Sequence, residues 1–385
     1  MLVASTACTP LIGLDHDYIV GDSGAGGQAS TAAGAGSGGM IDLGGAAGAG
    51  VAGAGVAGAA DALIPKTPPA GKLVYNRYTT YNTSDSEMFV VDLPEGTRSP
   101  ELGAAFGICN LMAGSFSPDG SHLAVTARPK TGAACPMGMN RNELEVYVLD
   151  LTTLGSTPTA ERVTNNTVPD EDPQFAPAGN FLLLKHDGHL AKWVLSAAPL
   201  TMCSAQSAGS FCFKSSGSEE SKPVMSSDEA LVCYYEKSGS NSDVFCFDVA
   251  QGAAGTDIIP ISVPAAAHPN ISEARPMIAG NWLYYARWLA SNNQVNRVYR
   301  KPIGELGAFE KAGVFQTDQA YDYSDPSIID GDLLVIASDA TGVGKHDLFA
   351  ADFNGNGLQS LDMWVPGFNS PKDDLGPSFW RKPSP

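Results

Sequence analysis

Short apolar runs separated by polar turns dominate the chain from residue 72 to residue 380. The runs have four to six residues, as in segments 146–150 and 231–235, and many are rich in aromatic and β-branched residues. Runs of this length between turn residues are typical of β-strands. The same region has no convincing helical periodicity, so the sequence predicts an all-β domain.

One pattern recurs at spacings of 50 to 59 residues. In its first copy, residues 114–125, a short strand leads through the turn Pro118-Asp119-Gly120 into a second apolar strand. Proline presets φ in such a turn, aspartate caps it, and glycine accepts a positive φ. Further copies begin at residues 173, 223, 276 and 326, and a half-copy begins at 377. Aromatic-centred strands that end in Asp follow at residues 88–92, 146–150, 244–248 and 348–352.

Four short strands in about fifty residues are typical of a β-propeller blade. The chain ends complement each other, because residues 72–77 match a second strand and residues 376–380 match a first strand. Five complete repeats and one shared blade therefore predict a six-bladed β-propeller in which the last strand closes the first blade. An open pair of β-sandwiches is the alternative, but it does not account for the complementary ends.

The turn Ser117-Pro118-Asp119-Gly120 resembles the hallmark of the TolB-type propeller repeat. Residues 176–179 and 226–229 match it in part, and residues 329–332 keep only the turn. The resemblance covers residues 72–380 and implies the fold, although this propeller serves many unrelated functions. Periplasmic TolB has an N-terminal α/β domain where this chain has a Gly/Ala-rich segment. The resemblance therefore does not imply a role in the Tol system.

The N-terminal region has the composition of an anchor and a tether. Small residues precede Cys8, which resembles the end of a bacterial lipoprotein signal, although Ser5 replaces the usual aliphatic residue. A charged segment and a full apolar segment are missing before it, so we expect an upstream start or a trimmed chain. Residues 1–20 are assigned to this signal, 21–71 to a disordered tether, and 72–385 to the propeller. The assignment predicts lipidation at Cys8 and a place in the cell envelope, in the periplasm or at the outer membrane or cell surface.

The chain is acidic, with a net charge of −18. An acidic surface repels phosphate backbones and disfavours nucleic acid as a partner. Carboxylates recur in the segment that enters each first strand: Glu171, Asp172, Glu220, Glu273, Asp325 and Asp374. A radial fold would gather them around one mouth of the channel, which predicts a site for a cation or a basic peptide. The alternative is a solvated rim of turn-capping carboxylates, in which Lys222 and Arg275 neutralise part of the charge.

Six of the seven cysteines remain when Cys8 is set aside, and an even number fits an oxidising compartment. A hairpin folded near residues 239–240 places Cys233 opposite Cys246, within reach of a disulfide. Cys203 and Cys212 bracket a Ser/Ala/Gly loop, and Cys109 and Cys135 are expected to tie two neighbouring loops. Buried free thiols are the alternative, and zinc is disfavoured because no CxxC spacing occurs.

Two segments resemble metal sites. Asp352, Asn354 and Asn356 have the spacing that begins a calcium loop, but Met363 occupies the position of the bidentate carboxylate. His186 and His189 flank a two-residue hairpin turn that would set their imidazoles opposite each other. Plain turns are the alternative for both, so calcium is the one cofactor that the sequence leaves open.

These observations predict a monomeric, non-catalytic envelope lipoprotein that binds a protein or peptide, which the acidic segments suggest is basic. One alternative is a polysaccharide lyase or hydrolase, because oligogalacturonate lyases resemble propellers of a related repeat type. Those enzymes use histidine clusters to bind metal, whereas the six histidines here are scattered. The other alternative is a calcium-dependent adhesion module that uses the Asp352 loop.

Overall fold

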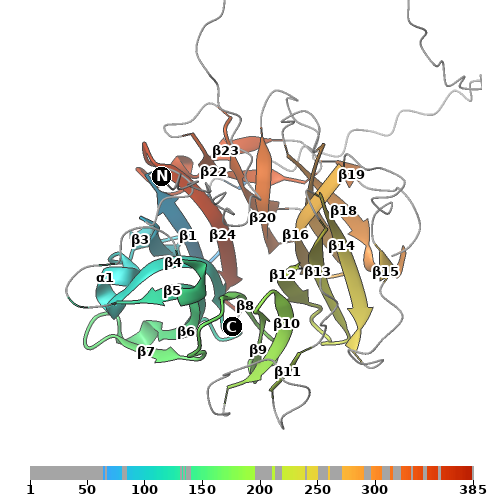
Figure 1. Ribbon diagram of the computed structural model, residues 1–385. Coiled ribbons are helices and arrows are strands. Elements are labelled where there is room, and N and C mark those ends of the chain that lie inside the picture. Colours follow the sequence, from blue (N-terminus) through green and yellow to red (C-terminus); the bar gives the residue numbers. More distant parts are fainter. Residues whose placement is uncertain are drawn as a thin grey trace, which may run out of the picture.

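The computed structural model is built almost entirely of antiparallel β-strands (Figure 1). It describes residues 64–65, 67–79, 85–130, 132, 135, 140–195, 210–212, 219–238, 241–249, 259–260, 271–289, 296–305, 313–314, 322–330, 333–340, 345–353 and 357–383. The predicted lipidation site at Cys8 and nearly all of the predicted tether lie outside these residues. No helix among the described residues is long and apolar enough to cross a membrane.

The described strands form six four-stranded sheets. Five of the sheets use consecutive strands of the chain. They are β4 (Ile108–Phe116), β5 (His122–Pro129), β6 (Glu145–Asp150) and β7 (Thr159–Arg162); β8 (Asp170–Phe175), β9 (Phe181–His186), β10 (His189–Val194) and β11 (Ser210–Cys212); β12 (Glu219–Met225), β13 (Leu231–Ser238), β14 (Asn241–Asp248) and β15 (Ile259–Pro260); β16 (Ile271–Ala279), β17 (Trp282–Leu289), β18 (Arg297–Pro302) and β19 (Gly313–Val314); and β20 (Tyr323–Asp330), β21 (Leu333–Ser338), β22 (Asp347–Asp352) and β23 (Leu358–Ser360).

The remaining sheet joins the two ends of the folded chain. Its order is β24 (Asp373–Arg381), β1 (Gly71–Tyr78), β2 (Glu87–Leu93) and β3 (Thr97–Arg98). β24 runs antiparallel to β1, with Lys72 opposite Trp380 and Val74 opposite Ser378. This is the pairing that the complementary chain ends predict.

The first strands of the sheets lie around a common centre (Figure 1). β4 contacts β8, β8 contacts β12, and the series continues through β16 and β20 to β24, which contacts β4. Buried apolar clusters fill the junctions between neighbouring sheets. In β9, for example, Leu182 and Leu184 pack toward the preceding sheet and Leu183 toward the following one. Because both faces of such a strand are covered, its sequence is continuously apolar.

Two sequence-based expectations need correction. The tether was expected to extend to residue 71, but Ile64 is buried in the cluster between the first and last sheets. The carbonyl of Pro65 also accepts a hydrogen bond of 2.9 Å from Nε1 of Trp364, so the packed region begins by residue 64. The short helix α1 (Leu102–Phe106) was not expected, because five residues are too few to show a helical period. Glu101 caps it by accepting hydrogen bonds from the backbone N–H groups of Gly103 and Ala104.

Short 3₁₀ segments complete the described structure. They are η1 (Arg141–Glu143), η2 (Leu151–Thr153), η4 (Ile303–Glu305) and η5 (Leu361–Met363).

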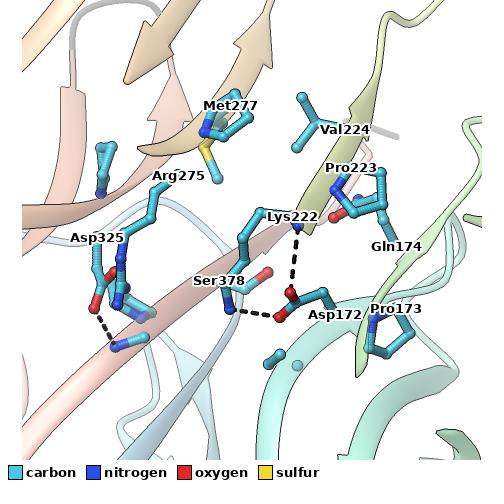
Figure 2. A pocket seen from close by; sticks show the side chains of 16 residues that line it. Asp172, Pro173, Gln174, Lys222, Pro223, Val224, Arg275, Met277, Asp325 and Ser378 are labelled. Carbon is cyan, nitrogen blue, oxygen red and sulfur yellow. Dashed lines mark hydrogen bonds and ion pairs between the residues drawn. The ribbon is translucent and has the colours of Figure 1, made fainter. Parts of the chain in front are cut away.

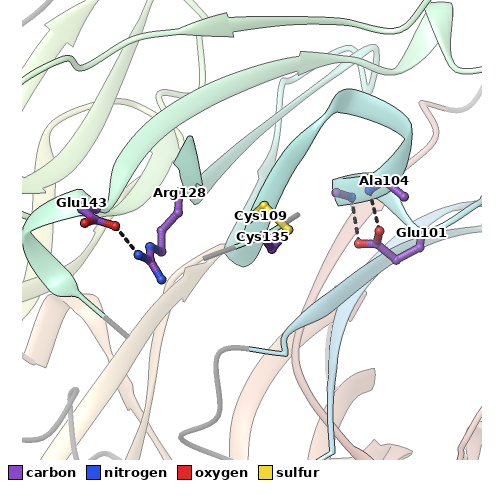
Figure 3. Close-up of a disulfide and its surroundings, with 7 residues drawn as sticks. Glu101, Ala104, Cys109, Arg128, Cys135 and Glu143 are labelled. Carbon is purple, nitrogen blue, oxygen red and sulfur yellow. Dashed lines mark hydrogen bonds and ion pairs between the residues drawn. A yellow bond between two sulfur atoms is a disulfide. The ribbon is translucent and has the colours of Figure 1, made fainter. Parts of the chain in front are cut away.

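Two of the three predicted cysteine pairs are disulfides. Cys233 faces Cys246 in the β13–β14 register and is bonded to it, as the hairpin predicts. Cys109 is bonded to Cys135 (Figure 3). Cys109 lies within strand β4, however, and not in a loop as expected. Cys203 and the side chain of Cys212 lie outside the described residues.

Candidate functional site

Each innermost strand carries the same backbone irregularity at its middle. Each has a residue with a positive φ where the register with the second strand shifts, and β4 has a further one at Asn110. These residues, which we call the bulge residues, are Ala113, Asp172, Lys222, Arg275, Asp325 and Gly376. A non-glycine residue in this conformation costs about 1–2 kcal/mol, and such strain is often found at ligand sites. β-Bulges also change the direction of the side chains around them.

The bulge residues and the residues after them surround a central cavity of about 130 Å³ (Figure 2). Its lining consists of residues 113–114, 172–174, 222–224, 275–277, 325–326 and 376–378. Cavities of about this size can hold a ligand as large as benzene. Because all six sheets contribute to it, the repeats combine into a single surface at this cavity.

Two ion pairs line the cavity. Lys222 Nζ lies 2.7 Å from Asp172 Oδ1, and the backbone N–H of Lys222 donates to Asp172 Oδ2 at 3.3 Å. Arg275 pairs with Asp325, whose Oδ2 also accepts the backbone N–H of Gly376 at 3.2 Å. Each aspartate therefore ties its own sheet to a neighbour. The aspartates are buried, whereas the Lys222 side chain is 30% exposed and the Arg275 side chain 14%.

The other predicted acidic residues do not line the cavity. Glu220, Glu273 and Asp374 have fully buried side chains. Their partners are His189 at 3.0 Å, Arg287 at 3.1 Å and Arg77 at 2.8 Å, respectively. Burial raises the pKa of Asp374 to about 6, against the lowering effect of Arg77.

Glu171 belongs to a separate ion-pair network. Its carboxylate lies 2.6 Å from Arg141 and 3.2 Å from Lys185. Glu219 contacts the same two cations. Arg141 lies in η1, between two strands of the second sheet, and Glu171 and Glu219 lie in the next two sheets. The network therefore joins three successive sheets, and none of these three residues lines the cavity.

Two of the six predicted carboxylates, Asp172 and Asp325, thus line the cavity, and the other four form ion pairs outside its lining. Glu171 belongs to the ion-pair network with Arg141, whereas its neighbour Asp172 lines the cavity. Asp172 and Asp325 face it because they are bulge residues. Lys222 and Arg275, which the sequence suggests only interrupt and neutralise an acidic ring, are the more exposed members of the cavity ion pairs. Their shared position, directly before a proline, is the signal that groups them with Asp172 and Asp325.

A second cluster of titratable groups lies where β24 begins, and the sequence analysis did not identify it. Nδ1 of His346 is 3.4 Å from Asp373 Oδ1, and its Nε2 is 3.9 Å from Asp322 Oδ2. Burial alone would lower the pKa of His346, but Asp322 and Asp373 outweigh it and raise the pKa to about 9. The backbone N–H of His346 also donates to Asp373. The cluster therefore links the last sheet to the strand that completes the first.

The predicted metal sites remain without structural support. His186 and His189 are opposite each other, but Asp170 contacts Nδ1 of His186, and Glu220 contacts Nδ1 of His189. Asp352 is buried, and Asn354 and Asn356 lie outside the described residues. Among the residues that the structure describes, no three His, Cys, Asp or Glu side chains are grouped to hold a metal.

The chain matches no known protein-family profile and no curated protein sequence. Solved structures do resemble it. TolB from Acinetobacter baumannii matches with a TM-score of 0.50 and 15% identity, over 80% of this chain and 66% of that one. Hydrazine synthase from Kuenenia stuttgartiensis matches with a TM-score of 0.60 and 11% identity, over 81% of this chain and 47% of that one. A chain of a nidogen/laminin complex matches with a TM-score of 0.50 and 8% identity, over 82% of this chain and 100% of that one. The chain therefore spans less than two thirds of the TolB and hydrazine synthase chains, and its fold is a TolB-like β-propeller.

Proposed function

We propose that the protein is a non-catalytic binding module of the cell envelope, and that it holds a protein or peptide at its central cavity. In this proposal the six sheets are the blades of a closed propeller, and Cys8 carries a lipid that attaches the monomer to the membrane. The observation that carries the proposal is the cavity itself, to which every sheet contributes a bulge residue.

The state of the carboxylates near the cavity favours binding over catalysis. A general acid or base must exchange protons with its substrate. Here Asp172 and Asp325 are held by a cation and by a backbone N–H group, and Asp374 is held by Arg77. Such fixed charges suit recognition. The resemblance to a chain of a nidogen/laminin complex shows that this fold also occurs in a protein–protein complex.

The two disulfides support an extracytoplasmic location. Disulfides persist in oxidising compartments such as the periplasm and are rare in the cytosol. Each of the disulfides Cys109–Cys135 and Cys233–Cys246 lies within one sheet and its loops, at sequence separations of 26 and 13 residues.

Mass spectrometry tests the lipid anchor. We expect it to detect a lipidated N-terminal peptide in the unmodified protein and to find that this peptide is lost in Cys8→Ser.

Occlusion of the cavity tests the binding function. Ser378 lines the cavity, so Ser378→Trp should fill it. Ser156 is exposed on a turn of the second sheet, so Ser156→Trp adds the same side chain far from the cavity lining. We expect the full chain and Ser156→Trp to capture the same envelope protein or peptide, and Ser378→Trp to lose it. Equal capture by all three would move binding to another surface, and capture by none would contradict the proposal.

A further inference from the structure

The cavity lining separates its charges in an ordered way. In the order of the sheets, Lys222 and Arg275 are neighbours, and Asp172 and Asp325 flank them on either side. The two remaining bulge residues are Ala113 and Gly376, which are small and uncharged. One side of the cavity is therefore lined by charged bulge residues with the two cations at their centre, and the other side by small, uncharged ones.

The aspartates are poorly placed to receive a ligand. Their side chains are only 7% and 5% exposed, and each is already paired with a cation and accepts a hydrogen bond from a backbone N–H group. Figure 2 shows the contacts of Asp172 with Lys222. The two aspartates also lie on opposite sides of the Lys222–Arg275 pair in the ring, so a ligand cation would meet like charge beside either one. The aspartates are therefore less suited than the two cations to receive a charged ligand group.

The cations are better placed. A lysine ammonium has three N–H donors and an arginine guanidinium has five, so each can hold its aspartate and a ligand oxygen at once. The charges of Lys222 and Arg275 also both act on the phenol of Tyr78, whose pKa each of them lowers. Burial raises the pKa of Tyr78, and a hydrogen bond with Ser86 and the charges of both cations oppose that rise. The two positive charges thus act on the same region of the molecule.

We infer that the central cavity binds a carboxylate, which Lys222 and Arg275 hold between them while the rest of the ligand lies against the small residues Ala113 and Gly376. This inference rests on the proposed binding function and names the chemistry of the inserted group. The carboxylate can come from an acidic side chain or from the C-terminus of a peptide, because both present the same pair of oxygens to the two cations.

Four short peptides separate these sources. Acetyl-Gly-Glu-Gly-amide carries a side-chain carboxylate, and acetyl-Gly-Gln-Gly carries only the terminal one. Acetyl-Gly-Gln-Gly-amide carries neither, and acetyl-Gly-Lys-Gly-amide carries a cation. Calorimetric titration of the full chain should give an affinity about tenfold or more higher for at least one carboxylate peptide than for the neutral amide, the factor expected for one charge-assisted hydrogen bond. Whichever carboxylate peptide binds identifies the source.

Neutral replacement of each cavity ion pair tests the residues. Asp172→Asn/Lys222→Met and Arg275→Met/Asp325→Asn remove both charges of a pair and so leave no unpaired charge buried. Lys72→Met/Asp92→Asn removes a similar pair, of 2.9 Å, outside the cavity lining. We expect either cavity variant to abolish the tenfold preference and the control to retain it, with folding checked by circular dichroism. If a cavity variant fails to fold, the preference of the unmodified chain among the four peptides decides.

Three results would overturn the inference: tightest binding of the lysine peptide, equal binding of the neutral amide and both carboxylate peptides, or no binding of any peptide at millimolar concentration. Each of these can occur while the full chain still captures an envelope partner that Ser378→Trp loses. Such a result would contradict carboxylate binding but not the proposed binding function, so the failure of one can be distinguished from the failure of the other.

Discussion

At the scale of single residues, the stability of the region around the start of β24 depends on buried charges and on the partners that neutralise them. Arg77 pairs with Asp374, whose side chain is fully buried where β24 begins. His346 lies beside Asp322 and Asp373 in the same part of the molecule. Loss of one partner from a buried pair is costly, because the remaining charge has neither water nor a counter-ion.

Replacement of Arg77 by methionine should therefore destabilise the protein by about 3–5 kcal/mol at neutral pH. The pKa of Asp374 is already raised, to about 6, so its contribution to stability is fully present at low pH and is lost as pH rises through that value. Arg77→Met should raise this pKa further, and its deficit should be smaller at pH 5 than at pH 8. Urea unfolding at both pH values measures this.

The double variant Arg77→Met/Asp374→Asn provides the control, because it removes both charges and should recover much of the lost stability. A deficit in Arg77→Met that does not depend on pH would contradict the assignment.

His346 predicts a loss of stability at alkaline pH. Its pKa is raised from 6.5 to about 9, so its contribution is fully present below pH 6.5 and is lost as pH rises through about 9. The raised pKa corresponds to at most about 3 kcal/mol. Asp322, Asp339 and Asp373 are the acidic groups that bear on this cluster.

We expect the unfolding free energy of the unmodified protein to fall between pH 6.5 and pH 9.5, and that of His346→Gln to fall less. Asp322→Asn should give an intermediate profile, since Asp373 remains. Parallel profiles for the protein and His346→Gln would show that His346 does not contribute.

At the scale of elements, the turns that follow the innermost strands pack against one another. The turn at Pro118-Asp119-Gly120 lies under Trp380 of β24, whose Nε1 donates a hydrogen bond of 2.8 Å to the Pro118 carbonyl. Asp119 caps this turn through Ser117 and Ser121. Gly120 has a φ of +69°, and a Cβ there would lie 2.5 Å from Trp380 Cε2. The turn thus holds the second sheet against the strand that completes the first.

Gly120→Ala should destabilise the protein by about 2–4 kcal/mol, because it adds backbone strain and also displaces Trp380. Gly107 provides a matched control, since its φ is also +69° but nothing lies within 4 Å of a Cβ built there. Gly107→Ala should cost only the strain, about 1–2 kcal/mol. Thermal unfolding with Trp fluorescence measures both, and equal losses would show that the Trp380 contact does not matter.

The strands and much of their pairing can be predicted from the sequence, because apolar runs mark the strands and the turns between them set the pairing. The hairpin turn near residues 239–240 fixes which residues of two apolar strands face each other, so Cys233 and Cys246 could be paired in advance. The direction of the acidic side chains could not be predicted in this way. It depends on bulges whose only local sign is a residue before proline, and residues before proline usually favour extended backbone. The partner of Asp374 is Arg77 of β1, 297 residues earlier in the chain, and nothing in the local sequence indicates this contact.

At the scale of the whole molecule, the first sheet is assembled from both ends of the folded chain. β24 supplies its innermost strand, a bulge residue of the cavity and the contacts with the sheets on both sides. The C-terminal strand is therefore part of the common core, and its pairing with β1 covers an edge of that strand.

Truncation after Lys372 removes β24 and should abolish cooperative folding. Truncation after Lys382 keeps the strand and the hydrogen bond from the Lys382 N–H to the Ala70 carbonyl, and it should leave stability unchanged. Limited proteolysis and thermal unfolding compare the two. An unchanged unfolding midpoint after removal of β24 would show that the first sheet does not need its closing strand.

Photo-crosslinking from inside the cavity is the decisive test of ligand binding there. A benzophenone amino acid replaces Ser378 in the full chain, or Ser156 in a control, and each protein is irradiated in envelope extract. We expect a discrete crosslinked protein or peptide from position 378 that is missing from position 156 and is competed away by the unmodified chain. Crosslinks that are the same from both positions, or absent from position 378, would contradict binding at the central cavity.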